Sequence, residues 1–183
     1  MLGFIRKKII SVRDLYLTKV KWKHYSFGRN FHAGRNVVLW ARNSITIGDN
    51  CYIGRNSQIE CNVKIGNDVL IANNVAFVGR YDHHYQQIGT SIRFASQVRD
   101  SDYSWLEEDR VTVVEDDVWL GYGVIVLSGV TLRTGSIIAA GSVVTKDVEA
   151  YSIYAGCPAK KISDRFECNA DSEKHKKIYK SNV

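Results

Sequence analysis

Two adjacent histidines, His83 and His84, lie in a polar segment that begins at Gly79. An imidazole with a pKa near 6.5 can take a proton from a weak nucleophile such as a hydroxyl near neutral pH. The imidazolium that forms needs an orienting partner on its other ring nitrogen, and Asp82 is the adjacent carboxylate. A pair of histidines in a polar loop is also often just solvated, so a catalytic base and a solvated pair both remain open.

A ladder of large apolar residues at a spacing of six surrounds this segment and must position it. An α-helix repeats its apolar face near 3.6 residues and a half-buried strand at 2, so a period of six indicates short, equal strands that meet at corners. Such repeats are typical of a β-solenoid with three flat sides. The ladder consists of Ile47, Ile53, Ile59, Ile65, Ile71 and Phe77, then Val114, Leu120, Val126, Leu132, Ile138 and Val144.

Two residues before each ladder position lies a small or medium residue that can share the same interior. Glycine or alanine often follows the ladder residue, where a corner leaves little room for a side chain. An earlier set that ends at Leu39 keeps the spacing but is out of phase, because eight residues separate Leu39 from Ile47. We therefore expect a two-residue bulge at Trp40-Ala41.

The ladder breaks after Phe77, so residues 78–109 are predicted to leave the solenoid as an excursion. Long ordered loops tend to carry function. Aromatic rings in this loop could stack on a sugar, with charged neighbours as hydrogen-bonding partners, which predicts an acceptor site. Packing of the same rings onto a neighbouring subunit is an equal alternative. The acceptor-binding candidates chosen from this loop are Tyr81, Tyr85 and Arg93.

Charge divides the chain of 183 residues into a basic arm and a balanced remainder. Residues 1–25 hold seven basic residues and one acidic residue, which equals the whole net charge of +6. We expect an amphipathic helix that caps the open end of the solenoid, with contact to an anionic membrane surface as the alternative. Nucleic acid is not expected to bind, because the arm shows no binding motif. The helix is indicated by the recurrence of Leu2, Ile5, Ile9, Val12 and Tyr16.

The solenoid domain is expected over residues 26–162, and a polar tail, either a short helix or a disordered end, over 163–183. No run approaches the 18 apolar residues of a membrane span, and Lys7 and Lys8 interrupt any stretch that resembles a signal peptide. The default expectation is a cytoplasmic protein, with the inner membrane surface as the alternative. The four cysteines include no CxxC pair, so we expect reduced structural thiols.

Four segments of the last coils carry motifs: VWLG at 118–121, LSGVTL at 127–132, AGSVVTKD at 140–147 and AGCPAK at 155–160. They resemble the C-terminal signature of hexapeptide-repeat acyltransferases, in particular the maltose, galactoside and polysaccharide O-acetyltransferase branch, and the ladder extends this resemblance over roughly residues 27–162. The resemblance implies an all-β fold, a left-handed parallel β-helix, assembled as a homotrimer with active sites between neighbouring subunits. The handedness rests on the resemblance alone, since parallel crossovers are right-handed in nearly all folds.

The resemblance also implies roles for individual residues. A catalytic histidine lies where the coil is interrupted, which favours His83 over His84. Acetyl-CoA, the acyl-donor substrate, would lie along the last coils. For Lys160 and Lys161, simple exposure to solvent is an equal alternative to acetyl-CoA binding. The chain departs from the family at Tyr122, where relatives usually carry a small residue. The residues assigned to acetyl-CoA are Trp119, Gly121, Tyr122, Ala140, Thr145, Lys146, Lys160 and Lys161.

Asn62 and Asn74 are further acceptor-binding candidates, because they precede the break, although asparagine also forms corners in solenoids. A zinc site is another interpretation of the histidines, since γ-class carbonic anhydrases resemble this fold and bind zinc through histidines. Such a site needs a third ligand. The remaining histidines are His24, His32 and His175, and none has a matching spacing, so we expect no metal.

The sequence thus predicts an acetyl-CoA-dependent O-acetyltransferase that acts on a saccharide hydroxyl in surface polysaccharide or lipopolysaccharide biosynthesis. His83 is the expected general base, and transfer is expected to be direct. The acceptor would be a small saccharide or a lipid-linked saccharide. An N-acetyltransferase of an amino sugar would use the same coils, and a structural or binding β-solenoid without activity is the alternative from another class.

Overall fold

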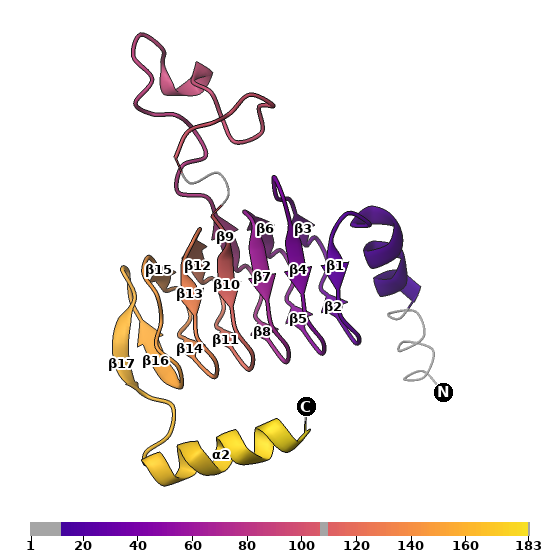
Figure 1. The fold of residues 1–183 in the computed structure, drawn as a ribbon, viewed down its shortest axis with the longest axis vertical. Helices are drawn as coiled ribbons and strands as arrows, with labels where there is room; N and C mark the ends of the chain where they lie inside the picture. Colours follow the sequence, from indigo (N-terminus) through magenta and orange to yellow (C-terminus); the bar gives the residue numbers. More distant parts are fainter. Residues whose placement is uncertain (1–11, 107–109, 183) are drawn as a thin grey trace.

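The computed structural model describes residues 12–106 and 110–182, which form a β-solenoid with a long loop and helical segments outside it (Figure 1). Short strands recur along the chain, and strands of neighbouring coils pair in parallel from β1 to β16. Each coil therefore contributes one strand to each of three sheets, which form the three sides of a prism. This architecture is consistent with the left-handed parallel β-helix that the resemblance implies.

The three sheets contain these strands. The first sheet holds β1 (Ser26–Phe27), β4 (Ile45–Ile47), β7 (Val63–Ile65), β10 (Thr112–Val114) and β13 (Thr131–Leu132). The second holds β2 (His32–Ala33), β5 (Tyr52–Ile53), β8 (Leu70–Ile71), β11 (Trp119–Leu120), β14 (Ile137–Ile138), β16 (Ser152–Ala155) and β17 (Lys160–Asp164). The third holds β3 (Val38–Leu39), β6 (Gln58–Glu60), β9 (Ala76–Val78), β12 (Ile125–Leu127) and β15 (Val143–Val144).

The six-residue ladder is confirmed as the core. Ile65 of β7 pairs with Ile47 on one side and with Val114 of β10 on the other, so ladder residues of successive coils stack in columns. All twelve ladder residues are at most 2% exposed, and so are the twelve residues two positions before them. Burial of one Ile or Leu side chain contributes roughly 1.5–3 kcal/mol, so these columns provide the main stabilisation of the solenoid.

Tight corners explain the small residues that follow the ladder. A side chain on Gly54 would meet the main-chain carbon of Ala72 at 2.4 Å, because successive coils approach closely there. Polar residues in inward positions are largely satisfied by the corners. Ser57 Oγ, for example, donates to the main-chain oxygen of Ala72 at 3.0 Å and accepts from the main-chain nitrogen of Val75 at 3.1 Å.

The N-terminal end of the solenoid is covered by residues 12–22, of which 12–16 are α-helical and continue into the π-helix η1 (Leu17–Lys21). Trp22 is buried and Leu17 packs against the core. Val12 and Tyr16, two members of the predicted apolar face, instead point to solvent. The wider turns of the π-helix shift the face that meets the solenoid away from the 3.6-residue spacing. The other members of that face, Leu2, Ile5 and Ile9, lie outside the described residues.

The predicted bulge and excursion are both present at the corner between the third and first sheets. Between Leu39 of β3 and Ile45 of β4 this corner is longer than in the other coils, as the phase shift indicates. The excursion leaves after Val78 and returns to β10 at Thr112, and it contains the 3-10 helix η2 (Ile92–Phe94). In Figure 1 the loop projects away from the prism, so it adds a separate surface to the solenoid.

The C-terminal residues are ordered rather than a loose tail. Strand β17 runs antiparallel to β16 and crosses the boundary expected at residue 162. Helix α2 (Asn169–Asn182) then passes back beside the solenoid, on the side opposite to the excursion (Figure 1). Tyr179 donates from Oη to Asp68 Oδ2 at 2.7 Å, and Arg165 pairs with Asp117 at 2.6 Å. Residues 169–182 thus adopt the helical alternative, and Tyr179 joins the helix to a middle coil.

No helix within residues 12–106 and 110–182 is both long enough and apolar enough to cross a bilayer. The four cysteines are free thiols, with Cys51 and Cys61 buried and Cys157 and Cys168 exposed. Burial raises the pKa of each buried thiol to about 11, so both stay protonated near neutral pH.

Candidate active site

The excursion that carries the two histidines starts at the corner between the third and first sheets, directly after β9. Two arginines hold its base. The main-chain N–H of Arg80 donates to Ser128 Oγ at 3.1 Å, and its guanidinium donates to the main-chain oxygen of Thr145. Arg42, on the long corner before β4, donates to the main-chain oxygen of Val98 at 2.9 Å. The histidine segment is therefore tied to several coils of the solenoid.

His83 is partly buried, and its main chain forms an isolated antiparallel bridge with Gln97 across the loop. Its Nδ1 atom is buried and has no hydrogen-bond partner within residues 12–106 and 110–182. A buried polar atom without a partner is rare and costs free energy in a finished structure. His83 thus has a buried ring nitrogen that is open to a partner from another molecule.

Asp82 does not serve as the orienting partner of His83 in this structure. Its carboxylate turns back toward Gly79, where it occupies the space that a side chain at residue 79 would need. Burial raises the pKa of the Asp82 carboxyl above its usual range, and the neighbouring Glu60 carboxylate acts in the same direction. Asp82 therefore belongs to the packed base of the loop rather than to the histidine ring.

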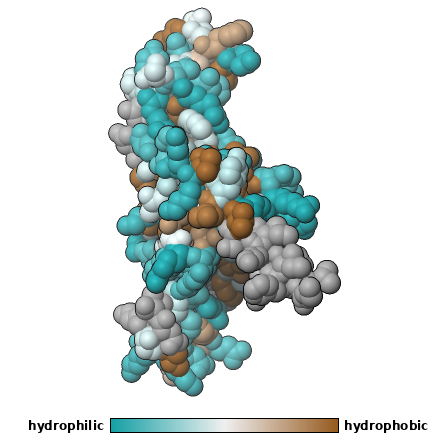
Figure 2. All heavy atoms as spheres, turned by 90° about the vertical axis from the view of Figure 1, so that its right-hand side faces the viewer, coloured by the Kyte–Doolittle hydropathy of each residue, from teal (hydrophilic) through white to brown (hydrophobic). Residues whose placement is uncertain are grey.

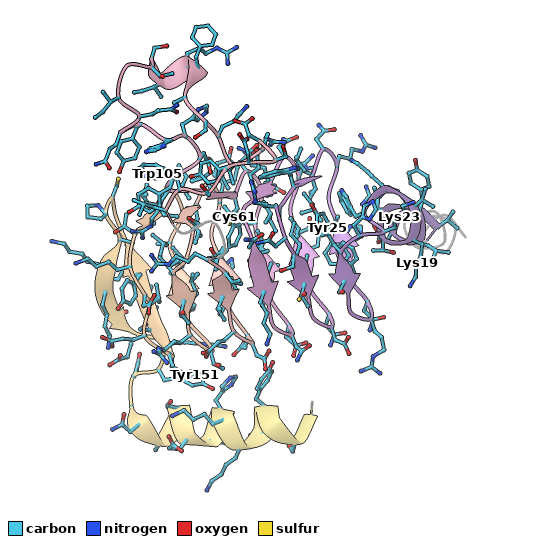
Figure 3. All side chains as sticks on the ribbon, turned by 45° about the horizontal axis from the view of Figure 1, so that its top comes forward. Lys19, Lys23, Tyr25, Cys61, Trp105 and Tyr151 are labelled. Atoms are coloured by element: carbon cyan, nitrogen blue, oxygen red, sulfur yellow. The ribbon has the colours of Figure 1, made fainter. Side chains whose placement is uncertain are left out.

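His84 has a different environment from His83. Its ring stacks on Trp105 with centroids 4.5 Å apart and an interplanar angle of 25°. Its main-chain N–H donates to the oxygen of Ser96 at 2.8 Å. The stacking on Trp105, which Figure 3 labels above the coils, indicates a structural role within the loop.

The predicted acceptor residues of the loop fall into two places. Tyr81 and Tyr85 lie with His84 around Trp105, which they meet edge to face at 5.4 and 4.7 Å between ring centroids. This aromatic cluster is next to His83 in the chain and offers ring faces near it. Arg93 is exposed on η2, at the outer end of the excursion, and is not part of the cluster.

A small cavity of about 40 Å³ lies beneath the loop, between the loop base and the solenoid corner. It has room for about one water molecule, so no sugar could enter it. Cys61, labelled in Figure 3, and Asn62 form its floor, while Asp82 and Tyr103 close it from the loop side. This cavity is therefore too small to be an acceptor site.

The two asparagines predicted to bind the acceptor lie at different corners. Asn62 is 4% exposed, and its Oδ1 accepts from the main-chain nitrogen of Asn43 at 2.9 Å, so it stabilises a corner. Asn74 lies at the corner between the second and third sheets, with a positive φ of 59°, and donates to Tyr122 Oη. Within one chain, neither side chain is placed with the aromatic cluster.

Residues predicted to bind acetyl-CoA are spread over two corners and two strands of the second sheet. Trp119 is 48% exposed on the outer face of the second sheet, and Gly121, Tyr122 and Ala140 follow at the corner between the second and third sheets. A side chain on Gly121 would meet the main-chain nitrogen of Ala140 at 2.7 Å, so the fold alone requires a glycine there. Exposed Trp119 and Tyr122 nevertheless offer a free apolar surface beside this corner.

Thr145 and Lys146 lie at the other corner, between the third and first sheets, where Thr145 accepts the hydrogen bond from Arg80. Lys146 and Lys160 are exposed and form no ion pair with the described residues. Lys161 is paired with Glu149 and Asp164, both at 2.8 Å, and these partners raise its pKa. Of Lys160 and Lys161, only Lys160 has no ion pair with the described residues that would compete with a phosphate.

Two residues that position the loop are absent from the sequence predictions. Arg42 donates to the loop main chain, and Glu60 pairs with Arg99 at 2.9 Å, while the Arg99 guanidinium covers the Trp40 ring at 4.0 Å. The phase shift between Leu39 and Ile47 adds residues to the corner that contains Arg42. Because extra corner residues point away from the core, this shift could have predicted that Arg42 contacts another segment. Glu60 directly follows the ladder residue Ile59, and nothing in the sequence spacing predicts its contact with the loop.

Within residues 12–106 and 110–182, no group of three or more His, Cys, Asp or Glu side chains is placed to hold a metal ion. His32, one of the distant histidines, instead bonds through Nδ1 to Asp14 Oδ2 at 2.6 Å. His175 lies on α2 and meets Asp117 at 3.1 Å. Neither histidine is near the loop.

Comparison with known proteins identifies the repeats. Residues 44–78 and 112–146 match the family described as bacterial transferase hexapeptide, with six repeats. Over 179 residues the chain is 32% identical to WbbJ of Escherichia coli, named as a candidate lipopolysaccharide biosynthesis O-acetyl transferase; the match covers 87% of each chain. The chain belongs to the hexapeptide-repeat transferase family. The excursion thus interrupts the repeats of a transferase solenoid, between its two matched blocks.

Other hexapeptide-repeat relatives are longer than the matched segment. The chain is 33% identical to the galactoside O-acetyltransferase of Escherichia coli over 83% of its own length, but this match covers 61% of that enzyme. A chloramphenicol acetyltransferase of Klebsiella aerogenes is 36% identical over 56% of this chain and 51% of its own. This chain therefore spans only half to three fifths of these two relatives.

Solved hexapeptide-repeat structures share the fold. AntD, an N-acyltransferase from Bacillus cereus solved with dTDP and coenzyme A, superposes with a TM-score of 0.59 at 14% identity, over 89% of this chain and 96% of AntD. NeuO, a polysialic-acid-specific acetyltransferase, gives a TM-score of 0.52 at 22% identity, over 87% and 77% of the two chains. At these identities the likeness is one of fold.

Proposed function

We propose that this hexapeptide-repeat protein is an acetyl-CoA-dependent O-acetyltransferase that modifies a saccharide hydroxyl in surface polysaccharide or lipopolysaccharide assembly. The observation that carries the proposal is His83, which lies at the interruption of the coil with a buried ring nitrogen that lacks a partner. Relatives named for acetyl transfer to galactosides and for lipopolysaccharide O-acetylation support the reaction class.

His83 would act as the general base. The acceptor hydroxyl gives its proton to the imidazole while its oxygen bonds to the thioester carbonyl carbon of acetyl-CoA. The carbon–sulfur bond then breaks, and the coenzyme A sulfur leaves with the proton held by His83. Base catalysis of this kind typically contributes about 10²–10⁴-fold, and the fixed loop base supplies positioning.

The last coils would bind the donor. Trp119 and Tyr122 present exposed rings to the pantetheine or adenine portion, and Lys160 and Lys146 are exposed cations without an ion-pair partner among the described residues. Lys161 is a weaker candidate than Lys160, because Glu149 and Asp164 already neutralise it. Thr145 would act mainly through its main chain, which holds Arg80.

A homotrimer would unite the two parts of the site. The loop that carries His83 starts at the corner between the third and first sheets. Gly121, Tyr122 and Ala140 lie at the corner between the second and third sheets. The third sheet separates these corners within one chain. A neighbouring copy can bring its own donor-binding corner to this loop, and it can also provide a partner for Nδ1 of His83.

The aromatic cluster beside His83 would hold the acceptor. Rings of Tyr81, Tyr85 and Trp105 form a surface on which a pyranose could stack. Arg93 lies too far out on the loop to share this surface in one chain, and Asn62 is already used by the fold. A saccharide carried on a lipid fits the relative named for lipopolysaccharide biosynthesis. With such an acceptor, the protein would work in the cytoplasm at the inner membrane surface.

An amino sugar is the second candidate acceptor. The chain is 46% identical over 55 residues to an enzyme of Staphylococcus aureus named as a tetrahydropyridine-dicarboxylate N-acetyltransferase, which covers 30% of this chain and 23% of that enzyme. A hydroxyl needs a stronger base than an amine does, because an amine is nucleophilic once neutral. His83 could serve as the base for either acceptor, and the relatives named for O-acetyl transfer favour a hydroxyl.

The first test is calorimetric titration of acetyl-CoA into the full chain, followed by an assay of coenzyme A thiol release with matched hydroxyl and amino sugars. We expect saturable binding near one molecule per chain and thiol release with hydroxyl sugars. Release with amino sugars alone would replace O- by N-acetylation. Absence of binding at millimolar acetyl-CoA would leave a structural solenoid.

A further inference from the structure

The N-terminal helical segment has one side that is fully used by the solenoid. Leu17 and Trp22 pack against the core, and Trp22 also meets Phe27 of β1 with ring centroids 6.0 Å apart. Asp14 Oδ2 bonds to His32 Nδ1 at 2.6 Å on the same side. These contacts fix the rotation of the segment, so they also fix which residues face away from the solenoid.

The side that faces away is apolar. Val12, Leu15, Tyr16 and Val20 are each 56–65% exposed. Val12, Leu15 and Tyr16 share one face of the α-helical residues, and Val20 lies four residues later in η1; together they are called the stripe. Figure 2 looks onto this end of the molecule, and hydrophobic atoms gather there between hydrophilic ones. An exposed stripe of this kind in a folded protein marks an interaction surface.

The stripe is bordered by positive charge. Lys19, Lys21 and Lys23 are exposed, and Asp14, the single acidic residue of the first 25, is already paired with His32. Lys19 and Lys23 also border an open groove of about 960 Å³ between this segment and the first coil, and Figure 3 shows both beside Tyr25 at this end. Leu15 of the stripe also lines this groove, so the two lysines lie at the edge of the apolar side chains.

We propose that this end of the solenoid docks on an anionic phospholipid bilayer, with the stripe Val12, Leu15, Tyr16 and Val20 in the headgroup region and Lys19 and Lys23 at lipid phosphates. An apolar face flanked by lysines is the pattern of a helix that lies in a membrane interface. A second copy of the chain is a poorer occupant, because two arms with a net charge of +6 each would repel. The inference does not depend on the reaction proposed above.

The test is co-sedimentation of the full chain with vesicles of phosphatidylcholine alone or with 30% phosphatidylglycerol. We expect binding to the anionic vesicles that weakens as salt rises. Lys19→Gln/Lys23→Gln should lower the partition coefficient about 25-fold, since each lysine near an anionic surface adds about fivefold. Leu15→Ser/Val20→Ser should lower it at least about tenfold, because burial of these side chains is lost.

Matched controls lie on β17 and α2, outside the N-terminal helical segment. Ile162→Ser/Ile178→Ser removes two exposed aliphatic side chains, and Lys174→Gln/Lys177→Gln removes two exposed lysines, and neither pair should change vesicle binding. Circular dichroism checks that each variant is folded. Equal binding to neutral and anionic vesicles, or wild-type binding by Leu15→Ser/Val20→Ser, overturns the proposal. A smaller oligomer for that variant in light scattering also overturns it and assigns the stripe to a second copy.

Thiol release with a free sugar distinguishes this proposal from the enzymatic one. The stripe and lysine variants should keep the wild-type rate with a water-soluble acceptor, because their substitutions are far along the chain from the loop. Loss of vesicle binding with an unchanged rate supports the docking surface. An inactive wild type that still binds anionic vesicles would remove the proposed reaction and leave the docking surface intact.

Discussion

His84 stacks on Trp105 with ring centroids 4.5 Å apart, while its neighbour His83 keeps a buried Nδ1 atom with no partner among the described residues. The two imidazoles therefore have different surroundings. By stacking on Trp105, the His84 ring helps to position the aromatic cluster. In the proposed reaction, His83 is the ring assigned to exchange a proton with the acceptor.

Substitution of the two histidines should therefore have unequal effects. His83→Gln should lower kcat by about 10²–10⁴-fold with little change in KM for acetyl-CoA, because a proton acceptor is lost. His84→Phe keeps a ring on Trp105 and should cost less than about tenfold. The assay is coenzyme A thiol release under saturating donor. Equal losses for both variants would contradict the assignment of His83.

Removal of Arg42 should loosen the excursion without unfolding the solenoid. Its guanidinium donates to the main-chain oxygens of Val98, Asp100 and Tyr103 at 2.9–3.1 Å, and lysine cannot reproduce this fork. Limited proteolysis should cut Arg42→Ala within residues 80–106 at a protease level that spares the wild type. Arg42→Lys should restore only part of the protection, and Arg35→Ala, at an exposed corner, serves as the control. An uncut Arg42→Ala loop would show that other contacts hold it.

A charge in the ladder should unfold the solenoid. Ile65 is 2% exposed and stacks between Ile47 and Val114, so Ile65→Asp buries an unpaired carboxylate and opens a gap in two coils. We expect a loss of more than about 4 kcal/mol in the free energy of unfolding. Lys64→Asp, one residue earlier and facing outward, should cost less than about 1 kcal/mol. Urea denaturation measures both, and a stable Ile65→Asp variant would disprove the register.

The buried thiols should make the fold less stable at high pH. Burial raises the folded-state pKa of Cys51 and Cys61 from 9.0 to about 11, so the folded chain keeps protons that the unfolded chain releases above pH 9. The free energy of unfolding should fall between pH 9 and 11, by up to about 1.4 kcal/mol per pH unit for each thiol. Stability below pH 9 should be unaffected by this titration.

The control for that experiment is Cys51→Ala/Cys61→Ala, in which lysines and tyrosines still titrate but the two thiols do not. The difference in unfolding free energy between wild type and variant should shrink as pH rises from 8 to 11. A difference that stays constant over this range would show that the two thiols titrate alike in the folded and unfolded chains.

The sequence was most informative where one physical requirement repeats. Ile47, Ile65 and Val114 all need the same dry interior, so their spacing alone predicted the three sheets and the register. The break after Phe77 and the phase shift after Leu39 were visible for the same reason. Family resemblance added the roles, and those of His83 and the donor-binding residues remain predictions.

Other features depend on contacts between residues distant in sequence, which spacing does not encode. The π-helix at 17–21 turned Leu17 rather than Tyr16 toward the solenoid. Helix α2 is fixed by the bond from Tyr179 to Asp68, which are 111 residues apart. The position of Asn62 before the break predicts contact with an acceptor. In the structure its Oδ1 instead accepts from the main-chain nitrogen of Asn43 and stabilises a corner.

The two ends of the prism are finished in different ways, and this limits its length. A parallel coil exposes main-chain donors and acceptors at each end, and identical coils could add there without limit, as they do in fibrils. Here Trp22 covers one end, while β17 reverses direction at the other and places Lys160, Lys161 and Asp164 on the outer edge. An antiparallel, charged edge is a poor template for another chain, so end-to-end polymerisation is disfavoured and sideways association is the route left for assembly.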